Sequence, residues 1–372
     1  MDNIVYFSKD LKDIDDKLHK RLGIRGRRAV DLARMGLPIA PGFIIDSELT
    51  KKLPQMNVKQ VIKPFIEKLE KDTKKKFGDA QKPLLVKVVL SSDLNVPHFP
   101  SIHNIGLNDT TVKGFAKFTG EDFAWGEYRF LLNSVGTKVH KLNHDEFKKL
   151  DTKSKSPKAA EIQKVVEAYK KYLGDKFSTD VYDQLGLILK GAAATYCDSD
   201  IDVDDSLSLM VQVMVYGNYG KNSYSGNYYT SNIVLGDSEI QGDFLQNEFD
   251  IDRAKPKDIS KIDKKYYDRL SEIARKVEEN FREIRAIKFT IEEGDFWLVE
   301  QREVDEKSTQ SHVKTLLDLC KRKIITEEFL VQNIKPNQLN ELLHPVIDPR
   351  TIKGVKSIKG GIAGSTGAAI GR

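Results

Sequence analysis

Cysteine and long apolar runs are nearly absent from this chain of 372 residues. The two cysteines, Cys197 and Cys320, lie far apart in predicted helical stretches, so we expect inert thiols rather than a disulfide. No apolar run reaches the roughly 18 residues that a membrane-spanning helix needs. The first residues, MDNIVYFSKDLKD, lack the apolar core of a signal peptide, so we expect a cytoplasmic location.

The chain also lacks a strong charge of either sign. Its 60 basic residues nearly balance its 55 acidic residues, which leaves a net charge of +5. A nucleic-acid-binding protein more often shows a concentrated basic face. We therefore expect neither nucleic acid nor a membrane as a partner. The length is sufficient for two domains or for one large domain with several lobes.

A metal-binding motif is missing as well, although one acidic cluster invites the comparison. Its members are Asp198, Asp200, Asp202, Asp204 and Asp205. An EF-hand loop counted from Asp198 requires glycine at its sixth position and glutamate at its twelfth. Val203 and Leu209 occupy those positions, so we expect a solvated acidic loop.

The hydrophobic patterns predict helices and strands mixed along the chain, which is typical of an α+β fold. Strands are predicted at residues 4–8, 43–45, 83–90 and 207–215. Helices are predicted at residues 27–35, within 53–77, within 111–191, around 266–284, and at 312–321, 327–333 and 337–343. Thr326 is the predicted N-cap of the helix at 327–333.

We expect four parts in the chain. They are a first strand-bearing lobe at residues 1–110, an inserted helical subdomain at 111–197, a second strand-bearing part at 198–345 and a linker at 346–372.

The stretch AIKFTIEEGDFWLVEQR, Ala286–Arg302, predicts a β-hairpin. A three-residue loop, Glu292–Gly294, places one set of apolar side chains on a single face: Ile287, Phe289, Ile291, Trp297 and Val299. The other face then carries Ala286, Lys288, Thr290, Phe296, Leu298, Glu300 and Arg302. On that face an ion pair is expected between Lys288 and Glu300.

Two glycine-bearing segments offer possible phosphate contacts. Gly23 and Gly26 precede a predicted helix and lie beside Arg25, so this loop either holds phosphate at a helix N-terminus or is an ordinary solvated helix start. The segment 216–232 is rich in Gly, Asn, Ser and Tyr. It either lays its backbone over phosphates or forms ordinary turns.

The order of several motifs resembles the pyruvate phosphate dikinase family, over its N-terminal ATP-grasp part. The matching stretches are GIRGRRAVDLARMGLPIAPGF, KFGDAQKPLLVKV, HNIGLNDTTVKGFAKFTG, MVYGN, KFTIEEG, ITEEF and LNELLHP. Residues 357–372 resemble the start of the family's phosphohistidine domain. The resemblance therefore implies an ATP-grasp-like fold in a divergent and truncated form, without that domain's histidine and without the pyruvate-binding barrel.

The family's nucleotide-binding residues match this chain poorly. The phosphate-binding lysine falls at Arg25, which keeps the charge with a different donor geometry. The arginine of the family's VRSG motif falls at Val89, and an arginine of its glycine-rich segment falls at Ser231. The bulky Tyr224 in the same segment could block a close approach of the backbone to phosphate.

The hairpin departs furthest from the family. The magnesium-binding glutamate falls at Lys288 and its partner glutamine at Glu300, while the closing arginine persists as Arg302. An ammonium group has no lone pair for a metal. The resemblance thus leaves Arg25, Glu300 and Arg302 as residual nucleotide-binding positions. It leaves no intact catalytic residue and no metal ligand set.

Two functions follow from the resemblance. The favoured function is that of a pseudo-enzyme with a binding, structural or assembly role. We expect its partner to be another protein or a second copy of the chain, and we expect no cofactor. The alternative is an ATP-dependent phosphotransferase, with ATP and magnesium, that phosphorylates a histidine domain on another chain. Nucleotide sensing without turnover lies between the two.

Overall fold

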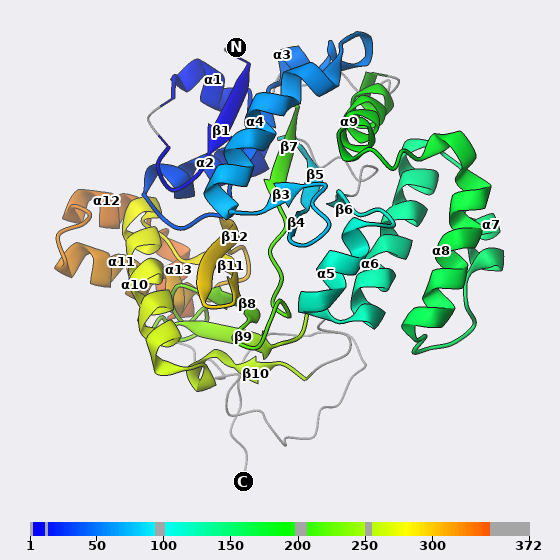
Figure 1. Cartoon of the computed structure of the whole chain (residues 1–372). Coiled ribbons are helices and arrows are strands. Elements are labelled where there is room, and N and C mark those ends of the chain that lie inside the picture. The colour runs from blue at the N-terminus through cyan, green and yellow to red at the C-terminus, as the bar shows by residue number, and fades with distance from the viewer. Residues whose placement is uncertain (1–2, 12–13, 94–100, 198–206, 250–254, 343–372) are drawn as a thin grey trace, which may run out of the picture. The chain divides into compact units, whose positions relative to one another are not determined.

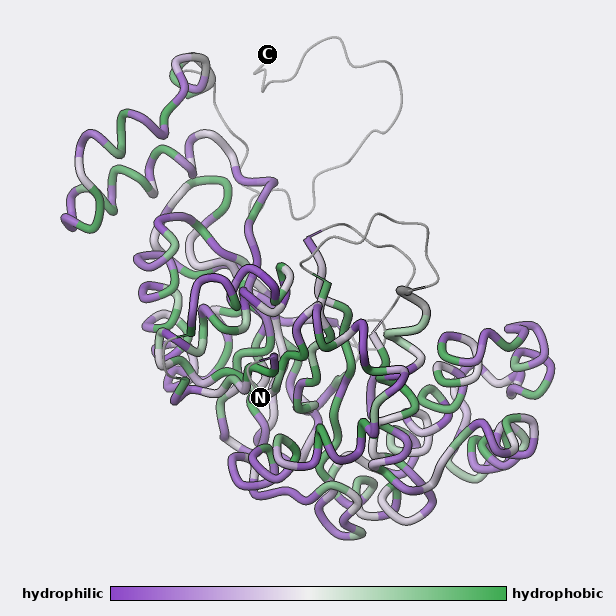
Figure 2. Tube along the Cα trace, turned by 90° about the horizontal axis from the view of Figure 1, so that it is seen from above, coloured by the Kyte–Doolittle hydropathy of each residue, from purple (hydrophilic) through white to green (hydrophobic). Residues whose placement is uncertain are grey.

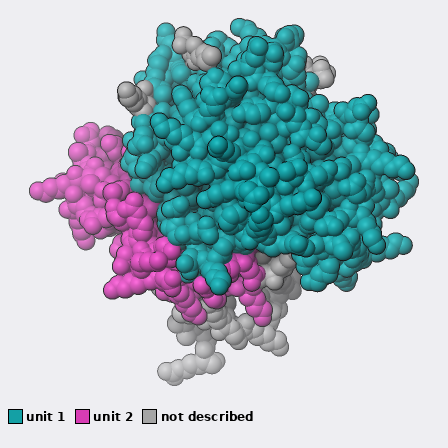
Figure 3. Space-filling view, viewed as in Figure 1, with its two compact units in different colours: residues 1–224, 290–300 teal, residues 225–289, 301–372 magenta. Residues whose placement is uncertain are grey.

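The computed structural model describes residues 3–11, 14–93, 101–197, 207–249 and 255–342 and mixes helices and strands along the chain (Figure 1). The predicted α+β class is confirmed. Two compact units are present, residues 1–224 with 290–300 and residues 225–289 with 301–372 (Figure 3). This division is coarser than the predicted four parts, which stay a prediction. The acidic cluster from Asp198 and the segment 346–372 lie outside the described residues.

A five-stranded sheet forms the centre of the first unit, with the strand order β1-β2-β7-β5-β6. The strands are β1 (Ile4–Phe7), β2 (Gly42–Ile45), β5 (Val86–Ser91), β6 (Ile102–Ile105) and β7 (Ser208–Val213). All neighbours in this sheet are antiparallel. Every residue of the central β7 is buried, including the polar Ser208 and Gln212, because the sheet is covered on both faces. A short parallel pair, β3 (Lys76–Phe77) and β4 (Pro83–Leu84), accompanies the sheet.

Helices surround this sheet in the first unit. They are α1 (Asp16–Lys20), α2 (Gly23–Arg34), α3 (Ser47–Thr50), α4 (Val58–Thr73), α5 (Thr111–Thr119), α6 (Glu121–Ser134), α7 (His144–Leu150), α8 (Ala159–Leu173) and α9 (Val181–Cys197). Short 3₁₀ turns lie at Leu53–Gln55 and Gly174–Lys176, and a π-helical turn follows α6 at Val135–Val139. Helices α5 to α9 lie between β6 and β7 in the chain, where the sequence predicts an inserted helical subdomain.

The second unit contains its own sheet, with the strand order β10-β9-β8-β11-β12. The strands are β8 (Tyr224–Tyr229), β9 (Gln241–Gln246), β10 (Lys257–Asp258), β11 (Arg285–Glu292) and β12 (Asp295–Glu303). The unit boundary crosses β11 and β12, so the tip of this hairpin, residues 290–300, belongs to the first unit.

Helices and a 3₁₀ turn complete the described part of the second unit. They are the turn Ile259–Lys261, α10 (Lys264–Phe281), α11 (Thr309–Lys321), α12 (Glu327–Gln332) and α13 (Pro336–Glu341). The predicted apolar stripe of α10 is buried at Leu270, Ile273 and Val277. Thr326 caps α12 as predicted, since its side chain accepts the N–H of Phe329 at 3.1 Å.

The helical trace alternates between hydrophilic and hydrophobic stretches, as expected for amphipathic helices on a hydrophobic core (Figure 2). None of the described helices combines the length and hydrophobicity needed to cross a bilayer. Cys320 is a free thiol, as predicted. The side chain of Cys197 is not among those described.

Candidate functional site

The start of α2 is bonded to the end of β5. The helix begins at Gly23, four residues before the predicted start at Arg27. Gly23 has φ of +63°, and a Cβ there would lie 2.5 Å from the backbone of Ser91, so only glycine fits. Ser91 Oγ accepts the N–H of Gly26 at 2.9 Å and donates to the carbonyl of Leu22 at 2.8 Å. The glycines therefore allow a close approach of this helix to the sheet.

Arg25 lies in the first turn of α2 and is exposed. It has no ion-pair or hydrogen-bond partner in the part of the chain that the structure describes. Its neighbour Arg27 is instead held by Asp93 through two hydrogen bonds of 3.1 and 2.6 Å. Of these two guanidinium groups, only that of Arg25 is available to an anion.

Val89 is part of the hydrophobic core of the first unit. It lies in β5 opposite Met210 of β7, and its exposed fraction is 3%. The family resemblance predicts an arginine at this position. Here the side chain is apolar and contributes to packing.

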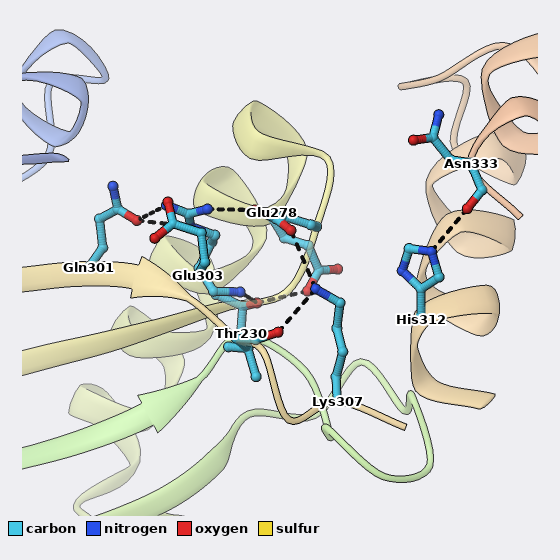
Figure 4. Close-up of polar contacts among 10 residues, drawn as sticks. Thr230, Glu278, Gln301, Glu303, Lys307, His312 and Asn333 are labelled. Carbon is cyan, nitrogen blue, oxygen red and sulfur yellow. Dashed lines mark hydrogen bonds and ion pairs between the residues drawn. The ribbon is translucent and has the colours of Figure 1, made fainter. Parts of the chain in front are cut away.

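Ser231 belongs to a buried polar cluster in the second unit. We call it the Glu278 cluster, and its members are Thr230, Ser231, Glu278 and Arg322. Ser231 Oγ donates to Glu278 Oε2 at 2.7 Å. Thr230 Oγ1 donates to the same oxygen at 2.9 Å (Figure 4). The guanidinium of Arg322 lies 3.8 Å from Glu278 Oε1. Burial raises the pKa of Glu278, while the two hydroxyls and Arg322 oppose the shift.

A buried arginine lies beside this cluster at the base of the hairpin. Arg285 donates to Gln301 Oε1 at 2.8 and 2.6 Å and to Glu303 at 2.7 Å (Figure 4). Glu283 binds both Arg285 and Lys307. Since Arg285 is 4% exposed and has several acceptors, its role is structural. Nothing local in the sequence distinguishes Arg285 from the exposed arginines nearby, so its burial could not be predicted.

The loop of the hairpin corrects one prediction. It has two residues, Glu293 and Gly294, with φ of +50° and +93°, as in a type I′ turn, and not three. Glu292 is the last residue of β11 and is buried. Ile287, Phe289 and Ile291 are buried as predicted, but Leu298, assigned to the polar face, is buried as well.

The ion pair predicted on the hairpin is not formed. Lys288, Glu300 and Arg302 are all exposed. Within the described ranges none of the three has an ion-pair or side-chain hydrogen-bond partner. Lys288 therefore presents a solvated cation and is not neutralised by Glu300. The prediction that a salt bridge replaces the metal is wrong.

The structure offers no substitute set of metal ligands among the residues that it describes. No group of three or more His, Cys, Asp or Glu side chains is placed to hold a metal ion there.

The chain is similar in sequence to several known proteins. The chain is 37% identical over 382 residues to pyruvate, phosphate dikinase of Treponema pallidum, an alignment that covers 99% of this chain. The chain belongs to the pyruvate, phosphate dikinase family. It is 30% identical to the protein of that name from Giardia intestinalis and 29% identical to that from Clostridium symbiosum, over 95% and 94% of its length. No family model matches the chain.

The chain corresponds to less than half of these relatives. It spans 42% of the Treponema protein and 44% of each of the other two. The sequence identity to these relatives supports the motif resemblance seen in the sequence and an ATP-grasp-like α+β fold.

Proposed function

We propose that this chain is a pseudo-enzyme, a non-catalytic form of the ATP-grasp-like domain with a binding, structural or assembly role. One observation carries the proposal: two positions that hold arginine in the family have been incorporated into the protein interior. Val89 packs in the sheet of the first unit, and Ser231 donates to the buried Glu278. Neither can contribute positive charge to a phosphate.

The chemistry of phosphoryl transfer makes these changes severe. Catalysis of this reaction depends almost entirely on positioning and on charge stabilisation by cationic side chains and magnesium. Magnesium requires oxygen ligands, and at the family's ligand position Lys288 presents an exposed ammonium. Two like charges about 4 Å apart repel by roughly 1–4 kcal/mol at surface-like dielectric constants. Lys288 would therefore disfavour a divalent cation at this position.

The role that remains is binding without turnover, and we propose a protein partner, either another chain or a second copy of this one. Exposed Arg25 and Arg302 keep cationic groups on the surface. They could attract phosphates electrostatically, so a weak, magnesium-independent affinity for nucleotides is compatible with the proposal.

Calorimetric titration with ATP and ADP, each with and without magnesium, tests the proposal. We expect no magnesium-dependent binding by the unmodified chain. Lys288→Glu restores a carboxylate, and Lys288→Gln is the matched control that removes the ammonium without adding a charged ligand. Magnesium-dependent binding at micromolar concentrations by the unmodified chain would overturn the proposal.

The alternative phosphotransferase predicts a different result. A separately produced histidine domain of the family would become labelled from γ-labelled ATP in the presence of this chain and magnesium. The exposed Glu300 is the one residual carboxylate that the resemblance leaves for such a reaction. Labelling that disappears in Glu300→Ala would support the alternative, and no labelling above background supports the pseudo-enzyme.

A further inference from the structure

A second buried ion pair lies in the first unit at the tip of the hairpin. Lys75, which follows α4, pairs with Glu292, the last residue of β11, and each side chain is 8% exposed. Taking two charges out of water is unfavourable unless the pair is well placed and its remaining polar atoms are bonded. The partners are 217 residues apart in the sequence. This pair therefore joins two distant segments at a defined position.

The same two side chains also contact the glycine- and tyrosine-rich segment Tyr216–Ser223. Glu292 Oε2 accepts the backbone N–H of Tyr216 at 3.1 Å. Lys75 Nζ lies 4.4 Å from the centre of the Tyr219 ring, within the range of a cation–π interaction. We call Lys75, Glu292, Tyr216 and Tyr219 the tip cluster.

Backbone bonds attach the rest of this segment to the hairpin. The N–H of Glu293 donates to Ser223 Oγ at 3.1 Å, and that of Gly294 donates to the carbonyl of Asn222 at 3.1 Å. Gly220 has φ of +80°, and a Cβ there would lie 2.7 Å from the side chain of Glu293. The positive φ favours glycine at this position.

Helix α5 holds the other side of the segment. The rings of Phe118 and Tyr219 stack at 4.4 Å with an interplanar angle of 6°. The N–H of Gly220 donates to the carbonyl of Phe118 at 3.0 Å, and that of Tyr219 donates to the carbonyl of Tyr216 at 3.3 Å. The backbone donors of Tyr216, Tyr219 and Gly220 are thus all used inside the chain.

We propose that the tip cluster holds segment Tyr216–Ser223 closed and so withholds its backbone amides from any phosphate group. An amide that already donates to a carboxylate or carbonyl must first break that bond to donate elsewhere. Opening the segment would also leave the charges of Lys75 and Glu292 without one of their contacts. The closed state is a property of the free chain; its consequence for nucleotides rests on the proposed function.

Amide hydrogen exchange on the full chain measures the closed state directly. We expect the amides of Tyr216 and Gly294 to be protected in the unmodified protein and to exchange at least about tenfold faster in Lys75→Met, because local opening then becomes easier. The matched control is Lys76→Met, which removes an exposed neighbouring ammonium and should leave both amides unchanged. Free exchange in the unmodified chain, or equal protection in Lys75→Met, would overturn the proposal.

A second variant keeps the test decisive if Lys75→Met fails to fold. Lys75→Met/Glu292→Met removes both charges and the acceptor of the Tyr216 amide. That amide should then exchange faster while Val88 and Val211, paired across the central sheet, stay protected. Continued protection of Tyr216 in this variant would contradict the proposal.

Titrating the same variants with ATP separates the two proposals. Faster exchange without ATP binding supports both. Faster exchange with newly gained, magnesium-dependent ATP binding supports the tip cluster and overturns the pseudo-enzyme. Unchanged exchange overturns the tip cluster, whatever the titration shows.

Discussion

Two buried carboxylates in this molecule are stabilised in different ways. Glu292 in the first unit has an ammonium directly bonded to it and accepts a backbone N–H with its second oxygen. Glu278 in the second unit accepts two hydroxyl hydrogen bonds, and its nearest guanidinium group is 3.8 Å away. A full ionic partner compensates a buried charge better than hydroxyls do. The two clusters should therefore respond differently to mutation and to pH.

The largest effect is expected where the ionic partner is removed. Lys75→Met leaves Glu292 charged and buried, so the free energy of unfolding should fall by about 3–5 kcal/mol. Lys75→Met/Glu292→Met should recover most of this loss, because replacing both partners by apolar groups is often neutral. Urea unfolding of the two variants measures the difference. A single variant as stable as the unmodified chain would show that Glu292 is not held by Lys75.

Removing a hydroxyl donor from the Glu278 cluster should lower the free energy of unfolding by less than Lys75→Met does. Ser231→Ala deletes one hydrogen bond to a charged group, which we expect to lower the free energy of unfolding by about 1.5–3 kcal/mol. The control is Ser238→Ala, an exposed serine of the same unit, with an expected change within about 0.5 kcal/mol. Equal effects of the two substitutions would mean that Ser231 does not stabilise Glu278.

Glu278 should also differ from Glu292 in how the free energy of unfolding depends on pH. Burial raises its pKa in the folded state above the ordinary value of 4.5, so the folded protein binds this proton more tightly than the unfolded chain does. The resulting stabilisation is full below that value and is lost as the pH rises through the raised pKa. Glu278→Gln should abolish this part of the pH dependence in thermal melts recorded upward from pH 4. An unchanged profile would assign the dependence to other groups.

The smallest effect is expected at the hairpin surface. Lys288 is exposed and has no ion-pair partner in the described ranges, so Lys288→Gln should change the free energy of unfolding by less than about 0.5 kcal/mol. A loss of several times that amount would mean that Lys288 has a stabilising partner after all. A large effect of Lys75→Met beside a small effect of Lys288→Gln would show that the fold depends on the buried charge and not on the surface charge.

The sequence predicted local features better than distant contacts. Strand and helix positions, the Thr326 cap and the hairpin itself follow from short-range periodicity and capping. The two-residue loop was missed because the face pattern favoured three residues and Glu-Gly is not a strong type I′ signal. Val89, Ser231 and Lys288 were singled out only through the family resemblance.

The polar clusters could not have been predicted from local patterns. Lys75 and Glu292 are 217 residues apart, and Ser231 and Glu278 are 47 residues apart. Their pairing depends on how the segments are packed, which hydrophobic periodicity does not specify. The Lys288–Glu300 prediction failed because it assumed a three-residue loop. The loop has two residues, and a change of one residue in register moves side chains to the other face of a sheet.

We propose that the chain no longer binds magnesium and ATP together. Calorimetric titration of the unmodified protein with ATP, in the presence and absence of magnesium, tests it most directly. We expect magnesium to leave the heat of ATP addition unchanged and any residual affinity to be weak and lost at high salt. Saturable, micromolar binding of ATP that requires magnesium would contradict it.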